Sequence, residues 1–277
     1  MDVAQYFSLE GKVAVVTGGG GVLGGAIAKG LAQAGANVAI TDINDERGER
    51  VSKEIEAHGP GKARAYHLDV FDRSTVESCC DSVCNDFGGV DILINTAGGN
   101  MKEATTSPDN SFFDLPADAL DKVIKLNFQA GVVMPCQVFG RAMKDNEAGG
   151  SIISISSMSA LLPLTRVPGY SAAKAAVDNF TKWLAVHFAQ EYNPKLRVNA
   201  IAPGFFLTDQ NRYLLTDEKT GELTDRGRTI IDHTPQGAFG EPGDLLGVTI
   251  WLASDSARFV TGIVVPIDGG FSSFSGV

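Results

Sequence analysis

The chain has 277 residues, of which 44% are hydrophobic, 20% are charged and 32 are glycines, a profile that suits a compact α/β protein with one large core. Its formal net charge of -10 argues against a nucleic-acid or anionic membrane partner, because both attract a basic face. The N-terminus lacks the basic start and apolar run of a signal peptide, and no segment approaches about 18 uninterrupted apolar residues, so the sequence favours a cytoplasmic protein without a membrane span.

Short β-branched runs alternate with longer helical patterns from the start of the chain. The expected strands lie at residues 12–17, 37–42, 63–70, 90–98, 150–157, 196–203 and 262–270. The expected helices lie at residues 23–35, 45–59 and 73–87, from after 116 to about 143, along the segment that carries Tyr170, and at 242–254. A polar stretch at 100–116 and an insertion at 204–240 interrupt this rhythm.

Repeated strand–helix units predict a parallel sheet with helices on both faces and right-handed connections. The strands are almost continuously apolar, as expected when both faces of a sheet are buried. No shift in composition marks a domain boundary. We therefore expect residues 1–277 to form one doubly wound α/β domain around a seven-stranded parallel sheet, with a substrate-loop insertion at about 204–240.

The first expected strand runs into the glycine-rich sequence TGGGGVLG at residues 17–24. Gly19, Gly21 and Gly24 match G-x-G-x-x-G at a strand-to-helix junction. Glycines at such a junction let the backbone approach a pyrophosphate, and the helix N-terminus presents free N–H groups to it. The pattern is weak alone in a glycine-rich tract, but its place after the first strand predicts a dinucleotide site.

Asp42 ends the second expected strand, 18 residues after Gly24, near the separation expected for an acid that binds ribose hydroxyls. The alternative role is a helix cap or a turn. A carboxylate here repels a 2′-phosphate, so we expect NAD(H) to be preferred over NADP(H). Ile43 and Asn44 bring no cation to reverse this preference, although Arg47 could reach the site if the loop folds back.

Tyr170 and Lys174, in GYSAAKAAV at 169–177, are four positions apart and share a helix face. An isolated pair of this kind is usually a surface feature. A free tyrosine is only about 0.1% ionised at neutral pH, and lowering its pKa by about three units requires roughly 4 kcal/mol. One positive charge at about 4 Å supplies a similar energy at an effective dielectric constant near 20, so a neighbouring ammonium can make the phenol a usable base near pH 7.

These motifs follow the order found in the short-chain dehydrogenase/reductase family, which the chain resembles over roughly residues 9–270. After the glycine turn come LDV, NTAG, Asn127 in KLNFQA, Ser157, the Tyr170–Lys174 pair and PGFFLT at 203–208. Ser157 precedes Tyr170 by 13 residues, the usual interval in the family. The resemblance implies a single-domain Rossmann fold and an NAD(P)-dependent enzyme that interconverts a CH–OH group and a ketone.

The chain departs from the family in its glycine turn. The usual T-G-x-x-x-G-x-G would place glycine at Val22, and a β-branched residue cannot adopt a positive φ cheaply. We therefore expect Gly20 and Gly21 to shift the tight turn by one residue. The second motif reads NTAG where many relatives have two asparagines, which keeps Asn95.

The resemblance assigns Asn127, Ser157, Tyr170 and Lys174 as the catalytic set. Tyr170 exchanges the proton of the reacting hydroxyl, Lys174 supports the phenol and binds the nicotinamide ribose, and Ser157 hydrogen-bonds the reacting oxygen. Asn127 holds a water that replaces the proton lost through Lys174. Besides Tyr170 and Lys174, the implied cofactor contacts are Gly18, Gly21, Val22, Leu23, Asp42, Asp69, Val70, Asn95, Ala97, Gly98, Pro203, Gly204, Phe205 and Thr208.

Substrate identity depends on the variable segments at 96–116, 158–169 and 204–240. The last of these is rich in basic residues, namely Arg212, Lys219, Arg226, Arg228 and His233. Cations and amides suit a hydroxylated acid better than a steroid or an acyl chain, because arginine binds carboxylates through two parallel hydrogen bonds. The alternative is a solvated charged surface. The expected substrate contacts are Asn100, Ser157, Arg166, Tyr170 and Arg212.

The segments FFLTDQNRYLLTDEKTGELTDRG and DGGFSSFSGV are similar to a sugar-acid subgroup of the family, the D-mannonate oxidoreductases or D-fructuronate reductases. This similarity implies reduction of D-fructuronate to D-mannonate. Gluconate 5-dehydrogenase-like activity and 3-oxoacyl or general carbonyl reduction are the enzymatic alternatives. A cofactor-sensing regulator is the non-enzymatic alternative, although such proteins typically lack part of the tyrosine–lysine pair. The family also implies a homotetramer, with the last strand and the tail at an interface.

The cysteines give no sign of a metal site or of a disulfide framework. Cys79, Cys80, Cys84 and Cys136 show neither C-x-x-C spacing nor a nearby histidine cluster. We expect them to be reduced, buried thiols.

Overall fold

The computed structural model describes residues 2–58, 61–208, 212–217 and 220–276. Within these residues one seven-stranded sheet has the order β3-β2-β1-β4-β5-β6-β7, and every neighbouring pair is parallel. The strands are β1 (Val13–Thr17), β2 (Asn37–Asp42), β3 (Ala63–His67), β4 (Ile92–Asn95), β5 (Gly150–Ile155), β6 (Leu196–Pro203) and β7 (Val264–Ile267). The predicted doubly wound fold is confirmed.

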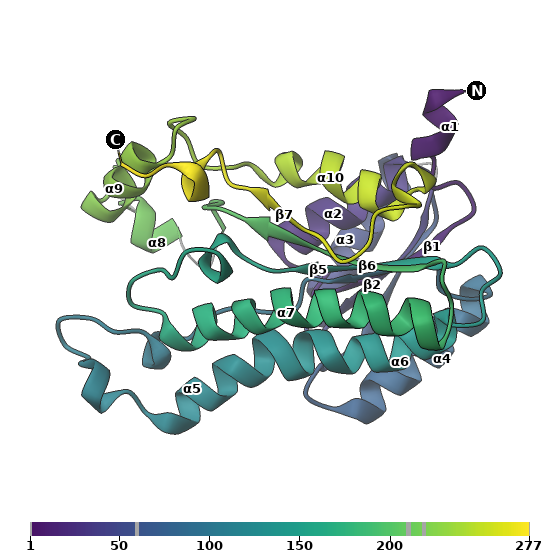
Figure 1. Ribbon diagram of the computed structural model, residues 1–277, viewed down its shortest axis with the longest axis horizontal. Coiled ribbons are helices and arrows are strands. Elements are labelled where there is room, and N and C mark those ends of the chain that lie inside the picture. Colours follow the sequence, from purple (N-terminus) through teal and green to yellow (C-terminus); the bar gives the residue numbers. More distant parts are fainter. Residues whose placement is uncertain (1, 59–60, 209–211, 218–219, 277) are drawn as a thin grey trace.

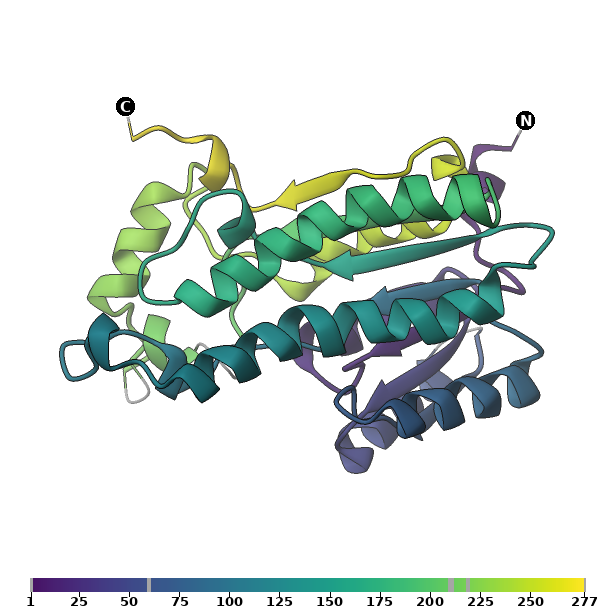
Figure 2. The ribbon, with the colours of Figure 1, turned by 60° about the horizontal axis from the view of Figure 1, so that its bottom comes forward.

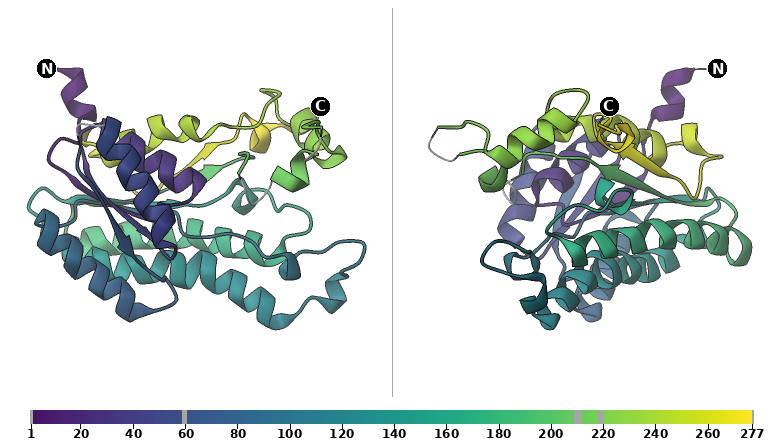
Figure 3. Two further views of the ribbon diagram at one scale, coloured as in Figure 1. Left: turned by 180° about the vertical axis from the view of Figure 1, so that it is seen from behind. Right: turned by 60° about the vertical axis from the view of Figure 1, so that its left-hand side comes forward.

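Helices cover both faces of this sheet, as Figures 1 and 2 show. One layer contains α2 (Val22–Gln33), α3 (Asp45–His58) and α10 (Leu246–Ala253). The other contains α4 (Arg73–Phe87), α5 (Ala117–Ile124), α6 (Met134–Met143) and α7 (Pro168–Glu191). Three further helices, α1 (Val3–Phe7), α8 (Arg212–Leu215) and α9 (Asp225–His233), lie at the two ends of the molecule (Figure 3).

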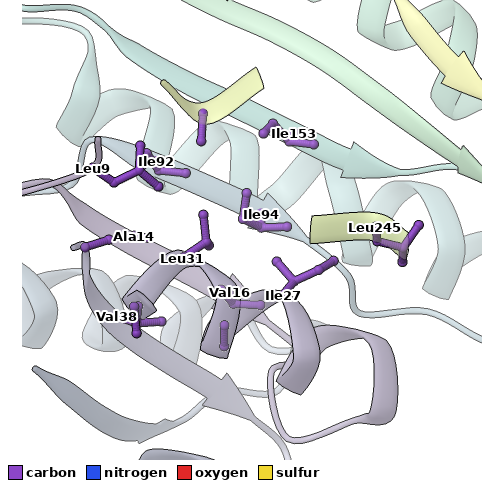
Figure 4. Packing of buried hydrophobic residues seen from close by; sticks show 14 of the residues in the cluster. Leu9, Ala14, Val16, Ile27, Leu31, Val38, Ile92, Ile94, Ile153 and Leu245 are labelled. Atoms are coloured by element: carbon purple, nitrogen blue, oxygen red, sulfur yellow. The ribbon is translucent and has the colours of Figure 1, made fainter. Parts of the chain in front are cut away.

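Each layer encloses its own core against the sheet. Alternate strand residues such as Val16, Ile94 and Ile153 pack with Ile27 and Leu31 of α2 on one face (Figure 4). On the other face the intervening strand residues pack against α4, α6 and α7. Because both faces are buried, no alternation of polar and apolar residues is needed along the strands, which explains their continuous apolar runs.

The predicted elements match in order, and the differences lie at their ends. Strands β3, β4, β5 and β7 are shorter than expected, because their last expected residues belong to the loops at the carboxyl edge of the sheet. The short helices α1, α8 and α9 were not predicted. Among the described residues, no helix combines the length and the apolar character needed to cross a bilayer.

Candidate active site

The carboxyl ends of the parallel strands meet at one edge of the sheet, and the predicted site residues gather there. Helices α8 and α9, the loop before α5 and the loop before α7 lie beyond the same edge (Figure 1). Crevices at this edge are the usual ligand sites of open parallel sheets. The N-terminus lies at the opposite end of the molecule (Figures 1 and 2).

The glycine turn joins β1 to the first turn of α2. Gly18 adopts the left-handed region, with φ 64°, and a Cβ added there would lie 3.0 Å from the Ala97 Cα. The Gly21 N–H donates to the Gly18 carbonyl at 3.1 Å and caps α2. A Cβ on Gly24 would collide with the same carbonyl. The turn therefore brings bare backbone and a helix N-terminus to the edge, the arrangement that fits a pyrophosphate.

The expected difficulty at Val22 does not arise. Val22 is the first helical residue of α2, and the positive φ in this turn falls on Gly18 instead. Among the described residues, Arg166 is the only residue other than glycine with a positive φ. Leu23 packs against the core beneath the turn, so its side chain faces the protein interior.

Asp42 is 8% exposed and sits directly beside the glycine turn. Its Oδ2 accepts a hydrogen bond from the Gly20 N–H at 3.0 Å, and its Oδ1 accepts one from the Asn44 N–H at 2.9 Å. The carboxylate is therefore both a turn residue and a negative group at the edge. A Cβ on Gly20 would lie 2.6 Å from the Arg47 Cβ, so the backbone of Arg47 packs on the turn.

Two further predicted cofactor segments follow β3 and β4. Asp69 accepts a hydrogen bond from the Phe71 N–H at 2.9 Å, and the adjacent Val70 is buried. The side chain of Asn95 is buried and donates to the Ser154 hydroxyl at 3.2 Å. Its side chain thus bridges β4 and β5 rather than facing the cleft.

Ala97 and Gly98 lie between the glycine turn and the catalytic residues. The Ala97 N–H donates to the Thr17 hydroxyl at 3.3 Å. A Cβ on Gly98 would lie 2.8 Å from Asn127 Oδ1 and 3.6 Å from Lys174 Nζ. Glycine at this position therefore keeps open the space beside the lysine head group.

Asn127 lies in a π-helical segment, Lys125–Val133, that joins α5 to α6. A π turn leaves backbone carbonyls without their usual partners. The Asn127 Nδ2 group donates to the Val123 carbonyl at 2.8 Å and to the Gly99 carbonyl at 2.6 Å, and Oδ1 accepts from the Gly99 N–H at 3.0 Å. Both N–H donors of the Asn127 amide are used within the protein. A water could therefore bind only to the oxygen of this side chain.

The other three predicted catalytic residues come together. The Ser157 hydroxyl lies close enough to the Tyr170 phenol to act on its pKa, and the Lys174 Nζ lies 5.5 Å from the centroid of the Tyr170 ring. Lys174 Nζ also donates to the Ile155 carbonyl at 2.7 Å. The end of β5 and one face of α7 thus place a hydroxyl, a phenol and an ammonium at the same point of the edge.

Burial sets the protonation of this group. It lowers the pKa of Lys174 to about 8, while the nearby Asp178 carboxylate opposes that change. It raises the pKa of Tyr170, and the hydrogen bond from Ser157 offsets part of the rise. The expected lowering of the Tyr170 pKa by Lys174 stays a prediction, because burial and Ser157 are the influences that act on the phenol in this arrangement.

The predicted contacts after β6 form one wall of the site. A Cβ on Gly204, which follows Pro203, would lie 2.7 Å from the Asp268 Cα. The Phe205 ring packs on Phe271 of the C-terminal tail at 5.2 Å between centroids. The Thr208 carbonyl accepts a hydrogen bond from the first N–H of α8 at 2.9 Å.

Of the predicted substrate residues, Asn100 and Arg166 are bonded within the variable segments, whereas Arg212 is exposed. The Asn100 amide donates to the Thr105 hydroxyl at 2.7 Å and is tied to its own loop. Arg212 begins α8 and is exposed, and Lys219 lies outside the described residues. Arg166 has φ 75°, and its carbonyl accepts a hydrogen bond from the Thr106 N–H at 2.9 Å, which locks two of the variable segments together.

Arg226, which was not among the predicted substrate contacts, joins Arg166. It lies half-buried in the first turn of α9. Burial lowers the pKa of its guanidinium, and the positive charge of Arg166 lowers it further. Neither arginine has an ion pair with a described residue. Only the tertiary placement of α9 reveals this pairing, because 60 positions separate the two residues.

The part of the chain that the structure describes contains no cluster of metal-binding side chains. No three His, Cys, Asp or Glu side chains gather there. Cys79, Cys80 and Cys136 are buried free thiols, and Cys84 is half-buried. Burial raises the pKa of Cys79 and Cys136 to about 12, so these thiols stay protonated.

Comparison with known proteins places this site in a family. A family profile described as enoyl-(acyl carrier protein) reductase matches residues 21–272. A Bacillus subtilis protein named uncharacterized oxidoreductase UxuB is 48% identical over 284 residues, covering 99% of this chain and 100% of the relative.

Solved structures agree with this placement. A Haemophilus influenzae structure, provisionally named a D-mannonate oxidoreductase and containing bound NAD, is 43% identical, has a TM-score of 0.90 and covers 100% of both chains. A Beutenbergia cavernae structure, provisionally named an NAD(P)-dependent gluconate 5-dehydrogenase and containing NADP, is 32% identical, with a TM-score of 0.84 and coverage of 97% and 99%. The chain therefore belongs to the short-chain dehydrogenase/reductase family of oxidoreductases.

Proposed function

We propose that this oxidoreductase interconverts a secondary alcohol and a ketone on a sugar acid, with D-mannonate and D-fructuronate as its pair. The observation that carries the proposal is that the charge of Arg166 acts on the Arg226 guanidinium beyond the catalytic edge, while neither arginine has an ion pair with a described residue. Two like charges held together favour an anion, and arginine binds carboxylates through parallel hydrogen bonds. The similarity to the Haemophilus influenzae structure supports the same substrate class.

We propose NAD as the preferred cofactor. Gly18, Gly21 and Gly24 shape the turn that would hold the pyrophosphate, and Asp42 would receive the ribose hydroxyls and repel a 2′-phosphate. Lys174 would hold the nicotinamide ribose, since Gly98 leaves space beside its head group. When bound, the cofactor accepts or supplies the hydride.

The residues of this chain handle the proton and the oxygen. Ser157 donates a hydrogen bond to the reacting oxygen and holds it beside Tyr170. Tyr170 takes the hydroxyl proton during oxidation and returns it during reduction. The charged Lys174 stabilises the phenolate at the moment that the proton has left. Asn127 fixes the loop at Gly99 against the π-helical segment and so keeps the cleft in shape.

A substrate panel tests the proposal. Initial rates are measured by NADH absorbance with D-mannonate, D-gluconate and a neutral secondary alcohol, and in reverse with D-fructuronate and a 3-oxoacyl thioester. We expect the highest kcat/KM for D-mannonate and D-fructuronate. A highest value for D-gluconate would favour the gluconate 5-dehydrogenase alternative, and turnover of the thioester alone would contradict a sugar-acid substrate.

We also propose a homotetramer, with the cytoplasm as its location. An exposed apolar patch near the end of α7 supports assembly, with Trp183, Val186 and the C-cap residue Tyr192 each more than half exposed. The tail supports it less than expected, because Phe271 and Phe274 pack on His233 of the same chain, at 4.6 and 5.2 Å between ring centroids. Light scattering tests the assembly, and a monomer mass would contradict it.

A further inference from the structure

Asp178 occupies an unusual place for a carboxylate, one helical turn after the catalytic lysine on α7. It is 8% exposed, and Lys174 is 5% exposed. Residues four apart on a helix lie on the same face, so Tyr170, Lys174 and Asp178 form one row. Charged side chains are seldom buried unless another group compensates them.

Three consecutive residues at the end of β5 meet this row one by one. The Ile155 carbonyl accepts a hydrogen bond from Lys174 Nζ at 2.7 Å. The Ser156 hydroxyl donates to Asp178 Oδ1. The Ser157 hydroxyl lies beside the Tyr170 phenol and acts on its pKa. The end of β5 therefore holds the Asp178 carboxylate in the same way that it holds Lys174.

The Asp178 carboxylate affects whether the buried Lys174 carries a charge. Among the described residues, the buried Lys174 ammonium donates to one acceptor, the neutral Ile155 carbonyl, so desolvation favours the uncharged amine. Asp178 supplies the opposing negative charge. The described groups that act on this row are Tyr170, Lys174 and Asp178 themselves, with Lys182 acting on Asp178 from the next turn of α7. Asn127 and the strand end contribute neutral groups.

We propose that Asp178, held by Ser156, is a positioning residue that keeps Lys174 protonated at the pH at which the enzyme works. The carboxylate touches neither the phenol nor the reacting oxygen, and it acts through the lysine. The inference concerns the charge of Lys174 in the protein and rests on the proposed function only for its kinetic consequence.

The direct test titrates Lys174 without any substrate. The protein is labelled with lysine carrying ¹³C at Cε, the Lys174 signal is assigned from its loss in Lys174→Arg, and its shift is followed against pH by NMR. We expect Asp178→Asn to lower the Lys174 pKa by about one unit from its value near 8. Asp178→Glu should restore most of the shift. An unchanged Lys174 pKa in Asp178→Asn would overturn the proposal.

Matched variants separate charge from structure. Glu191→Gln removes the same charge from the far end of α7 and should leave the Lys174 titration unchanged. Ser156→Ala keeps both charges but frees the carboxylate, so it should shift the Lys174 pKa in the same direction by less. If Asp178→Asn does not fold, the Ser156→Ala titration decides: a downward shift supports the inference and no shift overturns it.

The kinetic arm uses the best substrate of the panel. The alkaline limb of the pH profile of kcat/KM should move to lower pH by about one unit in Asp178→Asn and not in Glu191→Gln. An unmoved alkaline limb would overturn the positioning role. If no member of the panel is turned over, the proposed function fails, and the NMR titration still decides on Asp178.

Discussion

The two sides of the catalytic edge differ in whether their charged side chains have partners among the described residues. On the nucleotide side, Asp42 accepts two backbone N–H groups, and the glycine turn closes through a bond from Gly21 to Gly18. On the substrate side, Arg166 and Arg226 have no ion pair with a described residue, and Arg166 holds a left-handed φ.

This difference shows which part of the site is complete in the protein alone. A left-handed φ costs a residue other than glycine roughly 1–2 kcal/mol, and such strain is often found at ligand sites. Two cations without an ion pair to a described residue add a further electrostatic cost. The nucleotide side is thus held by its own hydrogen bonds, whereas the anion that we propose would lower the energy of the substrate side.

Between the two sides of the edge, the larger effect is expected on the substrate side, from the arginines. Arg226→Gln should raise KM for the sugar acid by about tenfold or more, because a hydrogen bond to a charged group is worth about 1.5–3 kcal/mol. The affinity for NADH should not change, since α9 lies on the substrate side. Initial-rate kinetics measure the first quantity and fluorescence titration the second.

Arg228→Gln is the matched control for this prediction. It lies two residues further along α9 and is 3.8 Å from Asp225, so its charge already has a partner. Equal effects of Arg226→Gln and Arg228→Gln on KM would contradict a specific anion site.

A smaller effect is expected on the nucleotide side from Asp42→Asn. Loss of the charge removes the repulsion of a 2′-phosphate, so the preference for NAD over NADP should fall by about tenfold or less. The hydrogen bond from Gly20 can persist, because the asparagine oxygen still accepts it. The ratio of kcat/KM for the two cofactors measures the change, and an unaltered ratio would contradict the role of Asp42.

The smallest effect is expected from alanine in the glycine turn, where backbone strain and close contact with the cofactor can be separated. Gly18 and Gly88 both have positive φ, but only Gly18 has neighbours where a Cβ would stand. Alanine at either position should cost about 1 kcal/mol of unfolding free energy for the strained φ. Only Gly18→Ala should also weaken NAD binding, by severalfold. Thermal unfolding and NAD titration measure both, and equal NAD affinities would contradict a close approach at Gly18.

The sequence predicts the nucleotide side well, because its signals are local. The order of strands and helices, the glycine turn and the position of Asp42 at a strand end follow from short patterns. The pattern alone does not show which glycine carries the positive φ, which falls on Gly18. It also does not show that the Asn95 side chain points to Ser154, since the strand's face decides this.

The substrate side could be predicted only in part, because its signals are tertiary. The sequence indicates that the 204–240 insertion is basic, but the meeting of Arg226 with Arg166 depends on how α9 folds back. The spacing of apolar residues around Asn127 does not indicate that this segment is π-helical. The raised pKa of Tyr170 depends on how deeply the phenol is buried, which spacing does not reveal.

The central claim is that the Tyr170 phenol carries the proton of the reaction, and Tyr170→Phe tests it most directly. The measurement is kcat for the best substrate of the panel, with NADH affinity determined on the same preparation. General acid–base catalysis contributes about 10²–10⁴-fold, so kcat should fall by that factor while NADH affinity is retained. A variant that keeps a substantial fraction of the wild-type kcat would contradict the account.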